Sequence, residues 1–126
     1  MEKRLRDPVV FDKRPWGWFH QYTLNEKSTV KIITVMPGEQ LSRQVHKNRD
    51  ELWVPLDDGL EVKLDDMGWS AMRFNECESM PIPIPRGRVH CVRNVSENMM
   101  ARFLEIALGD FDEDDIERLE DNYGRI

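Results

Sequence analysis

The sequence has few cysteines, no long hydrophobic run and no excess of basic residues. Its two cysteines, Cys77 and Cys91, lack the spacing of metal ligands, and reduced thiols in a cytosol explain them better than a disulfide does. No apolar stretch is long enough to cross a bilayer, and the charged opening residues do not form a signal-peptide pattern. These absences predict a cytoplasmic protein that has no membrane partner.

The charge of the chain is acidic overall but unevenly distributed. The net charge is −6, and residues 110–126 account for all of it with eight acidic and two basic side chains. The rest of the chain is neutral, which argues against nucleic acid as a partner because no basic surface dominates. A locally basic pocket can still exist within this neutral part.

The pattern of short apolar segments predicts an all-β fold. A chain of 126 residues with 40% hydrophobic content folds as one domain, and it buries about two-thirds of its surface. Segments rich in β-branched or alternating apolar residues are separated by Gly and Pro turns. The expected strands are 29–36, 52–56, 61–64, 69–74, 89–95 and 101–108. Residues 1–13 are expected to form a lead-in, and the three prolines of 81–85 restrict that segment to a sheet edge.

Residues 112–123 are expected to form a C-terminal helix. Asp112 can cap its start, and acidic residues fill its first turn. Ile116, Leu119 and Tyr123 recur at helical spacing, so they would form an apolar stripe that packs on the rest of the fold.

Four polar side chains form a candidate metal site. Gln44 and His46 are two residues apart, which places both side chains on one face of a strand. Glu51 follows after a short polar turn, and His90 lies on another expected strand behind a Pro/Gly turn. Either histidine alone is more simply explained as a partly buried, hydrogen-bonded residue. Together, an amide oxygen, two imidazoles and a carboxylate favour a site for Zn, Mn, Fe or Co.

These residues resemble the two sequence motifs of the cupin superfamily. The matching positions are Gly38, Gln44, His46 and Glu51 in the first motif, and Pro85, Gly87, His90 and Asn94 in the second. Gln44 stands where the first histidine is usual, and the glycine that closes the first motif is displaced to Gly59. The resemblance implies that residues 1–126 form a single cupin domain. Its fold would be a double-stranded, jelly-roll-like β-barrel with the C-terminal helix added.

Two further segments are similar to type II mannose-6-phosphate isomerases. They are Arg-Pro-Trp-Gly at residues 14–17 and the acidic segment 113–125. The same domain forms the C-terminal part of bifunctional mannose-1-phosphate guanylyltransferase/isomerases. The resemblance covers nearly the whole chain from Arg14 onward, and it implies a metal-dependent isomerase of mannose 6-phosphate and fructose 6-phosphate. It also implies zinc, although the ligands would accept Mn, Fe, Co or Ni as well.

The resemblance assigns roles to several charged side chains. Lys31 and Arg49 match family residues near the ligands and are expected to act in catalysis, with Lys31 also contacting the sugar phosphate. Lys31 can alternatively extend to the barrel rim. Glu105 is a candidate base, or else the partner of a lysine in a structural ion pair. Arg14 is expected near the sugar, and Arg88 can supply positive charge at the barrel mouth, so both are candidate substrate-binding residues.

Four positions depart from the isomerase pattern. Asn48 and Leu52 replace histidines of the usual cluster, Cys91 stands where arginine is common, and Ala107 stands where glutamine is usual. The four ligand positions survive these changes. A non-enzymatic, metal-containing sugar-binding cupin is therefore the alternative to the isomerase. An iron-dependent oxygenase shares the barrel, but the type II tail argues against it.

The expected partners are a small phosphosugar and a second copy of the chain. Cupin relatives are often homodimers, and the aromatic segment 14–19 offers a candidate interface. Packing in a core or interface explains its tryptophans better than ligand stacking does.

Overall fold

The structure is a computed structural model that describes residues 10–73 and 81–125. Within these residues the chain forms strands and no helix, so nothing in them is a helix long and apolar enough to cross a membrane. The strands are β1 (Val10–Arg14), β2 (Gly17–Gln21), β3 (Ser28–Val35), β4 (Arg43–Val45), β5 (Asp50–Pro55), β6 (Leu60–Leu64), β7 (Ser70–Ala71), β8 (Ile82–Ile84), β9 (His90–Asn94), β10 (Ala101–Leu108) and β11 (Glu117–Glu120).

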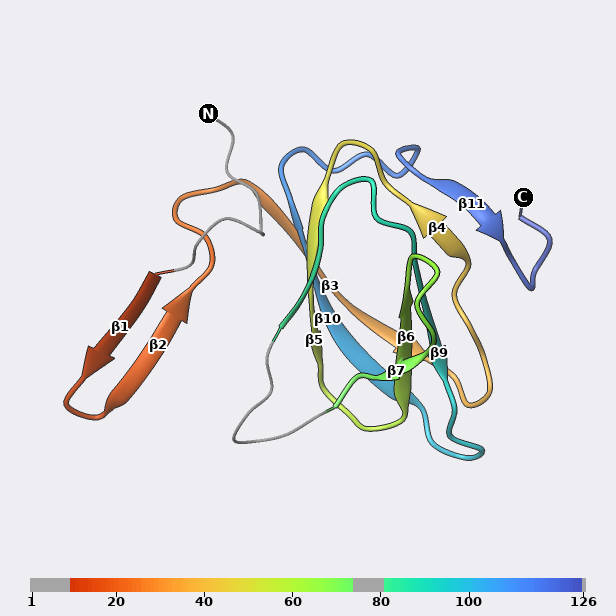
Figure 1. The fold of residues 1–126 in the computed structure, drawn as a ribbon, viewed down its shortest axis with the longest axis horizontal. Coiled ribbons are helices and arrows are strands. Elements are labelled where there is room, and N and C mark those ends of the chain that lie inside the picture. Colours follow the sequence, from red (N-terminus) through yellow and green to blue (C-terminus); the bar gives the residue numbers. More distant parts are fainter. Residues whose placement is uncertain (1–9, 74–80, 126) are drawn as a thin grey trace.

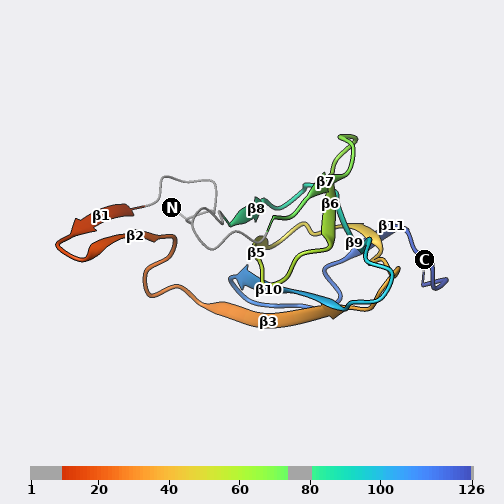
Figure 2. The ribbon, with the colours of Figure 1, turned by 90° about the horizontal axis from the view of Figure 1, so that it is seen from below.

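Two antiparallel sheets face each other and form the barrel (Figures 1 and 2). One sheet has the strand order β3-β10-β5-β8, and the other has the order β11-β4-β9-β6-β7. From β3 onward the chain passes from one sheet to the other at almost every connection, as in a jelly roll. The expected all-β, cupin-like fold is confirmed.

The central strand β10 shows how one strand serves both the core and the site. It pairs with β3 from Ala101–Val35 to Leu108–Ser28, and with β5 from Phe103–Pro55 to Leu108–Asp50. Phe103 and Glu105 are both buried and point to the same face, because side chains two residues apart share a face of a strand. β10 ends where β5 and β9 begin, at the same end of the barrel (Figure 1).

The hydrophobic core lies between the sheets and supports the polar end of the barrel. Its buried members are Val35, Trp53, Leu60, Val62, Met72, Ile84, Val92, Ala101 and Phe103. Burying a large side chain of this kind stabilises the fold by about 1.5–3 kcal/mol. The Trp53 ring lies 5.1 Å from that of Phe103 and stands edge-on to the His90 ring at 5.3 Å. Trp53 therefore joins the apolar core to the residues expected to bind the metal.

The proline-rich segment has the predicted edge position. β8 is the terminal strand of its sheet, and it pairs with β5 through Glu51–Ile84, Leu52–Pro83 and Trp53–Ile82. A proline has no N–H to donate to a second neighbour, so an edge is the place where it fits.

The predicted helix over residues 112–123 is wrong. A turn at residues 112–115 leads into β11, which pairs with β4 through Glu117–Val45, Arg118–Gln44 and Glu120–Arg43. The supposed apolar stripe is not buried, since Leu119 is 37% exposed and Tyr123 is 53% exposed. The free edge of β4 presents backbone groups that a partner strand satisfies and a helix does not, so tertiary pairing overrides the local helical pattern.

The N-terminal hairpin of β1 and β2 lies apart from both sheets (Figures 1 and 2). It exposes Trp16 (74%) and Trp18 (61%), and the outer face of the edge strand β3 exposes Val30 (58%) and Ile32 (60%). Uncovered apolar surface of this kind marks an interaction site. We propose that two copies associate through these two surfaces, because each chain offers both a free aromatic hairpin and an apolar edge strand that can receive one.

A chain truncated after Gly109 tests whether the acidic tail belongs to the fold. It lacks β11, so the edge of β4 loses its partner strand. We expect the thermal midpoint, followed by circular dichroism, to fall by at least about 4 °C. Truncation after Gly124 keeps β11 and should leave the midpoint nearly unchanged. Equal midpoints for the two truncated chains would show that the tail does not contribute to stability.

A hairpin variant tests the homodimer. Replacing Trp16 and Trp18 by serine should convert a dimeric parent into a monomer, measured by light scattering after size-exclusion chromatography. Met67 is also exposed (63%) but lies outside both surfaces, so Met67→Ser is the matched control and should stay dimeric. A monomeric parent, or a hairpin variant that remains dimeric, would contradict this interface.

Candidate metal centre

The ends of three strands bring the expected ligands together. His46 directly follows β4, Glu51 is the second residue of β5, and His90 is the first residue of β9. Gln44 and His90 are cross-strand partners in the β4–β9 pair, so their side chains lie on the same face of the sheet. The connection between β4 and β5 is short, and it carries the chain from one sheet to the other within the candidate site.

His46, Glu51 and His90 form a compact buried cluster. Each offers one ligand atom, and these three atoms lie within 4.8 Å of one another. Oε1 of Glu51 is 3.7 Å from Nε2 of His46 and 3.8 Å from Nε2 of His90. The three residues are only 1–3% exposed. The structure therefore confirms that these residues meet in the fold and could hold a metal ion.

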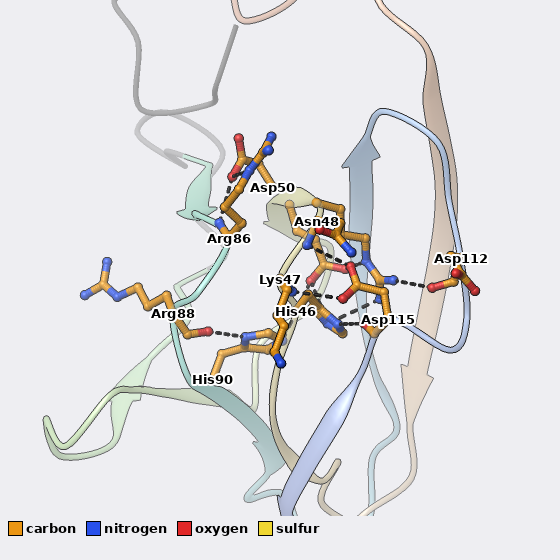
Figure 3. A network of polar contacts seen from close by, with 11 residues as sticks. His46, Lys47, Asn48, Asp50, Arg86, Arg88, His90, Asp112 and Asp115 are labelled. Atoms are coloured by element: carbon orange, nitrogen blue, oxygen red, sulfur yellow. Dashed lines mark hydrogen bonds and ion pairs between the residues drawn. The ribbon is translucent and has the colours of Figure 1, made fainter. Parts of the chain in front are cut away.

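The outer nitrogens of both imidazoles contact backbone carbonyl oxygens (Figure 3). Nδ1 of His46 lies 2.6 Å from the Asp115 oxygen, and Nδ1 of His90 lies 2.9 Å from the Arg88 oxygen. A carbonyl oxygen only accepts, so each Nδ1 carries the proton and donates it. This tautomer leaves a lone pair on each Nε2, facing Glu51, as in metal sites whose histidines are oriented by a carbonyl.

The protonation states of the cluster suit a cation. Burial lowers the pKa of His46 and brings that of His90 to about 4, so both imidazoles are neutral near pH 7. Burial acts to raise the pKa of Glu51, but hydrogen bonding with Glu105 and electrostatic interactions with His46, His90 and Arg49 outweigh it, so the pKa is lowered. Neutral imidazoles and an ionised carboxylate are the forms that bind a metal.

Two buried atoms of the cluster lack hydrogen-bond partners among the described residues. They are Oε1 of Glu51 and Nε2 of His90. A buried polar atom without a partner costs about 1–3 kcal/mol. A divalent cation between Glu51 and the histidines would satisfy both atoms, so the residues present fit a metal. The donor set does not select one metal ion.

The guanidinium of Arg49 lies beside the ligands. Its Nε donates to Oε2 of Glu51 at 3.0 Å, and its Nη2 lies 3.2 Å from Nε2 of His46. Nη1 donates to the Asp112 oxygen at 3.0 Å, and the group stacks 4.5 Å from the centre of the Phe111 ring. One lone pair cannot serve two partners, so metal binding at His46 requires this Nη2 contact to open. The contact with Oε2 can remain.

Glu105 and Lys31 lie on the neighbouring strands with their side chains in the same cavity. They are cross-strand partners in the β10–β3 pair. Burial and the adjacent Glu51 raise the pKa of Glu105 to about 8. Nζ of Lys31 lies 4.2 Å from the centre of the Phe111 ring. Glu105 is hydrogen-bonded to Glu51, which makes it a candidate proton-transfer group. An ion pair between Glu105 and Lys31 is not seen among the described contacts.

Two expected substrate contacts do not reach this cavity in a single chain. Arg14 lies on the hairpin, where it pairs with Asp12 at 2.8 Å. The Arg88 side chain pairs with Asp65 at 3.1 Å and points away from the cluster, so only its backbone oxygen contacts His90 (Figure 3). Sequence spacing cannot reveal such orientations, because both depend on which loop packs beside the residue.

The cavity holds both expected and unexpected residues. Its volume is about 650 Å³, and Gln44 lines it together with His46 and Glu51. The role of Gln44 as fourth ligand stays a prediction. The sequence reasoning missed three tail residues. They are Phe111, under the two cations, Asp115, which binds His46, and Arg118, which lines the cavity. The resemblance of residues 113–125 was a usable signal, but the helix expectation concealed it.

Replacing either histidine tests the metal centre. We expect His46→Ala and His90→Ala to lose the stoichiometric metal found in the purified parent, measured by mass spectrometry of the elements, because each removes one buried nitrogen ligand. His20 is the third histidine of the chain and lies on the exposed hairpin, so His20→Ala is the control and should keep the metal. Unchanged metal in all three variants would show that the ion binds elsewhere.

Comparisons with known proteins agree with this site. Residues 6–121 match the family model of the mannose-6-phosphate isomerase C-terminal domain. The chain is 37% identical over 114 residues to mannose-1-phosphate guanylyltransferase ManC of Salmonella typhimurium, covering 90% of the chain and 22% of ManC. It is 38% identical over 113 residues to the alginate biosynthesis protein AlgA of Pseudomonas putida, covering 89% of the chain and 22% of AlgA. The chain therefore spans less than a quarter of these relatives.

Solved structures share the fold at low sequence identity. The capsular polysaccharide assembling protein CapF from Staphylococcus aureus has a TM-score of 0.63 and 16% identity, over 90% of this chain and 35% of CapF. A Klebsiella pneumoniae protein with a double-stranded β-helix domain has a TM-score of 0.61 and 12% identity, over 94% of this chain and 90% of that chain. These similarities show the fold alone. The family match over nearly the whole chain shows more: the protein belongs to the family of the mannose-6-phosphate isomerase C-terminal domain, the cupin domain found in enzymes such as ManC and AlgA.

Proposed function

We propose that the chain interconverts mannose 6-phosphate and fructose 6-phosphate, with a divalent metal, zinc by resemblance to the family, held by His46, Glu51 and His90. The observation that carries this proposal is a buried ligand triad beside a raised-pKa carboxyl, Glu105, in one polar cavity of a chain of this family. Gln44 completes the proposed ligand set from the same cavity.

The reaction moves one proton between two neighbouring carbons and another between their oxygens. A bound metal supplies a Lewis acid that polarises these oxygens. Glu105 is the candidate for proton transfer, because a carboxyl whose pKa is about 8 can both hold and release a proton near neutral pH. Glu51 stays ionised beside it, since its pKa is lowered, and the two carboxyls therefore have different tasks.

Arg49 and Lys31 supply the positive charge of the cavity. Arg49 is held by Glu51, the Asp112 oxygen and the Phe111 ring, so its guanidinium can stabilise negative charge that develops on the sugar oxygens. Lys31 lies over the same ring and, among the described residues, lacks the backbone and carboxylate contacts that fix Arg49. We assign it to the substrate.

The sugar-binding alternative rests on the four departures from the family pattern, and the positions of Leu52 and Cys91 weaken it. None of Asn48, Leu52, Cys91 or Ala107 lines the cavity of the described structure. Leu52 packs with Leu108 on the opposite face of β5 from Glu51, and the thiol of Cys91 donates to the Leu41 oxygen at 3.3 Å. Ala107 differs from these two, because it is the cross-strand partner of Glu51 and shares the inward face of β10 with Glu105. The loss of a glutamine there is therefore the departure that best supports the sugar-binding alternative.

A Glu105→Gln variant tests the isomerase. In a coupled assay with mannose 6-phosphate we expect kcat to fall at least about 100-fold, because the amide cannot transfer the proton. The metal content should remain that of the parent. Glu61 pairs with Arg93 at 2.7 Å outside the cavity, so Glu61→Gln is the matched control and should retain activity.

The parent protein separates the two candidate functions. Turnover of mannose 6-phosphate by the metal-loaded parent supports the isomerase. Binding without turnover would favour the sugar-binding module. A fully active Glu105→Gln variant would remove Glu105 from the mechanism.

A further inference from the structure

Arg118 lines the cavity beside the candidate metal centre and has no role in the proposed reaction. Arg118 lies on β11, and its Nε is buried without a hydrogen-bond partner among the described residues. The same residues form no ion pair with its guanidinium. A buried donor without a partner is a cost to the fold, and at the wall of a cavity a ligand can remove that cost.

The strand register places Arg118 in line with the metal ligands. Arg118 is the cross-strand partner of Gln44, and Gln44 is the partner of His90. Cross-strand partners share a face, so the three side chains form one row that faces the opposite sheet. The backbones of β9 and β11 are two strand spacings apart, about 10 Å. Arg118 therefore lies to one side of the metal centre, along the cavity.

A matching row crosses the opposite sheet and ends in Lys31. Lys31 is the partner of Glu105, and Glu105 is the partner of Trp53. β3 and β11 are the edge strands of their sheets, so Lys31 and Arg118 occupy the two edges that border the same side of the cavity. Lys31 also forms no ion pair within the described part of the chain, and its Nζ lies 4.2 Å from the centre of the Phe111 ring.

The charges of the cavity leave these two cations available. The third cation, Arg49, is bound to Glu51 at 3.0 Å. Four acidic residues also line the cavity: Glu51, Glu105, Glu113 and Asp114. Glu51 and Glu105 lie in the metal cluster, and Glu113 and Asp114 are exposed on the turn that precedes β11. An anion that binds between Lys31 and Arg118 would lie at the edge strands β3 and β11, to one side of Glu51 and Glu105.

We infer that Arg118 and Lys31 form the subsite for the phosphate group of the substrate, while the reacting end of the sugar lies at the metal centre. This inference rests on the proposed function for the identity of the ligand, a hexose phosphate. Two cations on facing edges can bind a phosphate from both sides, with the arginine as a planar donor and the lysine as a point charge. β11, expected from sequence to be a helix, thereby carries a residue that selects phosphorylated sugars.

Binding measurements test the subsite without requiring turnover. Calorimetric titrations of the metal-loaded protein would use fructose 6-phosphate and unphosphorylated fructose as probes. We expect Arg118→Met and Lys31→Met each to weaken fructose 6-phosphate binding at least about tenfold, because each deletes a charged hydrogen bond. Fructose binding and metal content should not change. Arg102 pairs with Asp57 at 2.8 Å outside the cavity, so Arg102→Met is the control and should bind like the parent.

The outcomes distinguish this subsite from the proposed activity. A parent that binds fructose 6-phosphate through Arg118 but does not convert it would refute the isomerase and retain the subsite. A parent that binds fructose 6-phosphate no tighter than fructose would overturn the subsite, whatever its turnover. An Arg118→Met variant with parental affinity, or one that weakens both sugars equally, would also overturn it. If that variant does not fold, Arg118→Lys and Lys31→Met decide, with partial and selective loss expected.

Discussion

The buried carboxylate of Glu51 is the constraint on which the polar end of the barrel depends. Removing a charge of this kind from water costs on the order of several kcal/mol unless partners compensate. Here Arg49 donates to one oxygen, Glu105 is hydrogen-bonded to the carboxylate, and two histidines face the other oxygen. The remaining unpaired atoms lie where a divalent cation fits, so metal binding would complete a network that the protein alone leaves partly unsatisfied.

The acidic tail is part of this network. The backbone oxygen of Asp115 orients His46, and its carboxylate accepts hydrogen bonds from the backbone N–H groups of Lys47 and Asn48 (Figure 3). These bonds hold the ligand loop against the tail, and the Asp112 oxygen binds Arg49. The net charge of the tail therefore says little about the ligand, because its acidic groups support a cavity whose lining includes three cations.

The strand register decides which side chains of the two sheets act together. The rows Arg118–Gln44–His90 and Lys31–Glu105–Trp53 together use six strands. Cross-strand partners point to the same face, so all the side chains of a row point inward if one of them does. A shift of one residue in any of these pairs would turn a functional side chain out of the cavity. The apolar core, through the contact of Trp53 with His90, holds this register at the site.

The sequence by itself determined the all-β class, the edge position of the proline segment, and the three candidate ligands His46, Glu51 and His90. These features depend on local physics: alternation sets the face of a strand, proline limits pairing, and motif spacing selects ligand types. The tertiary structure alone decided that residues 117–120 pair with β4, that Arg14 and Arg88 face away from the cavity, and that Arg118 faces into it. The physical reason is that the conformation of an edge segment depends on the backbone N–H and C=O groups with which it can form hydrogen bonds. For β11 these groups belong to β4, about 70 residues earlier in the chain, so local sequence does not reveal them.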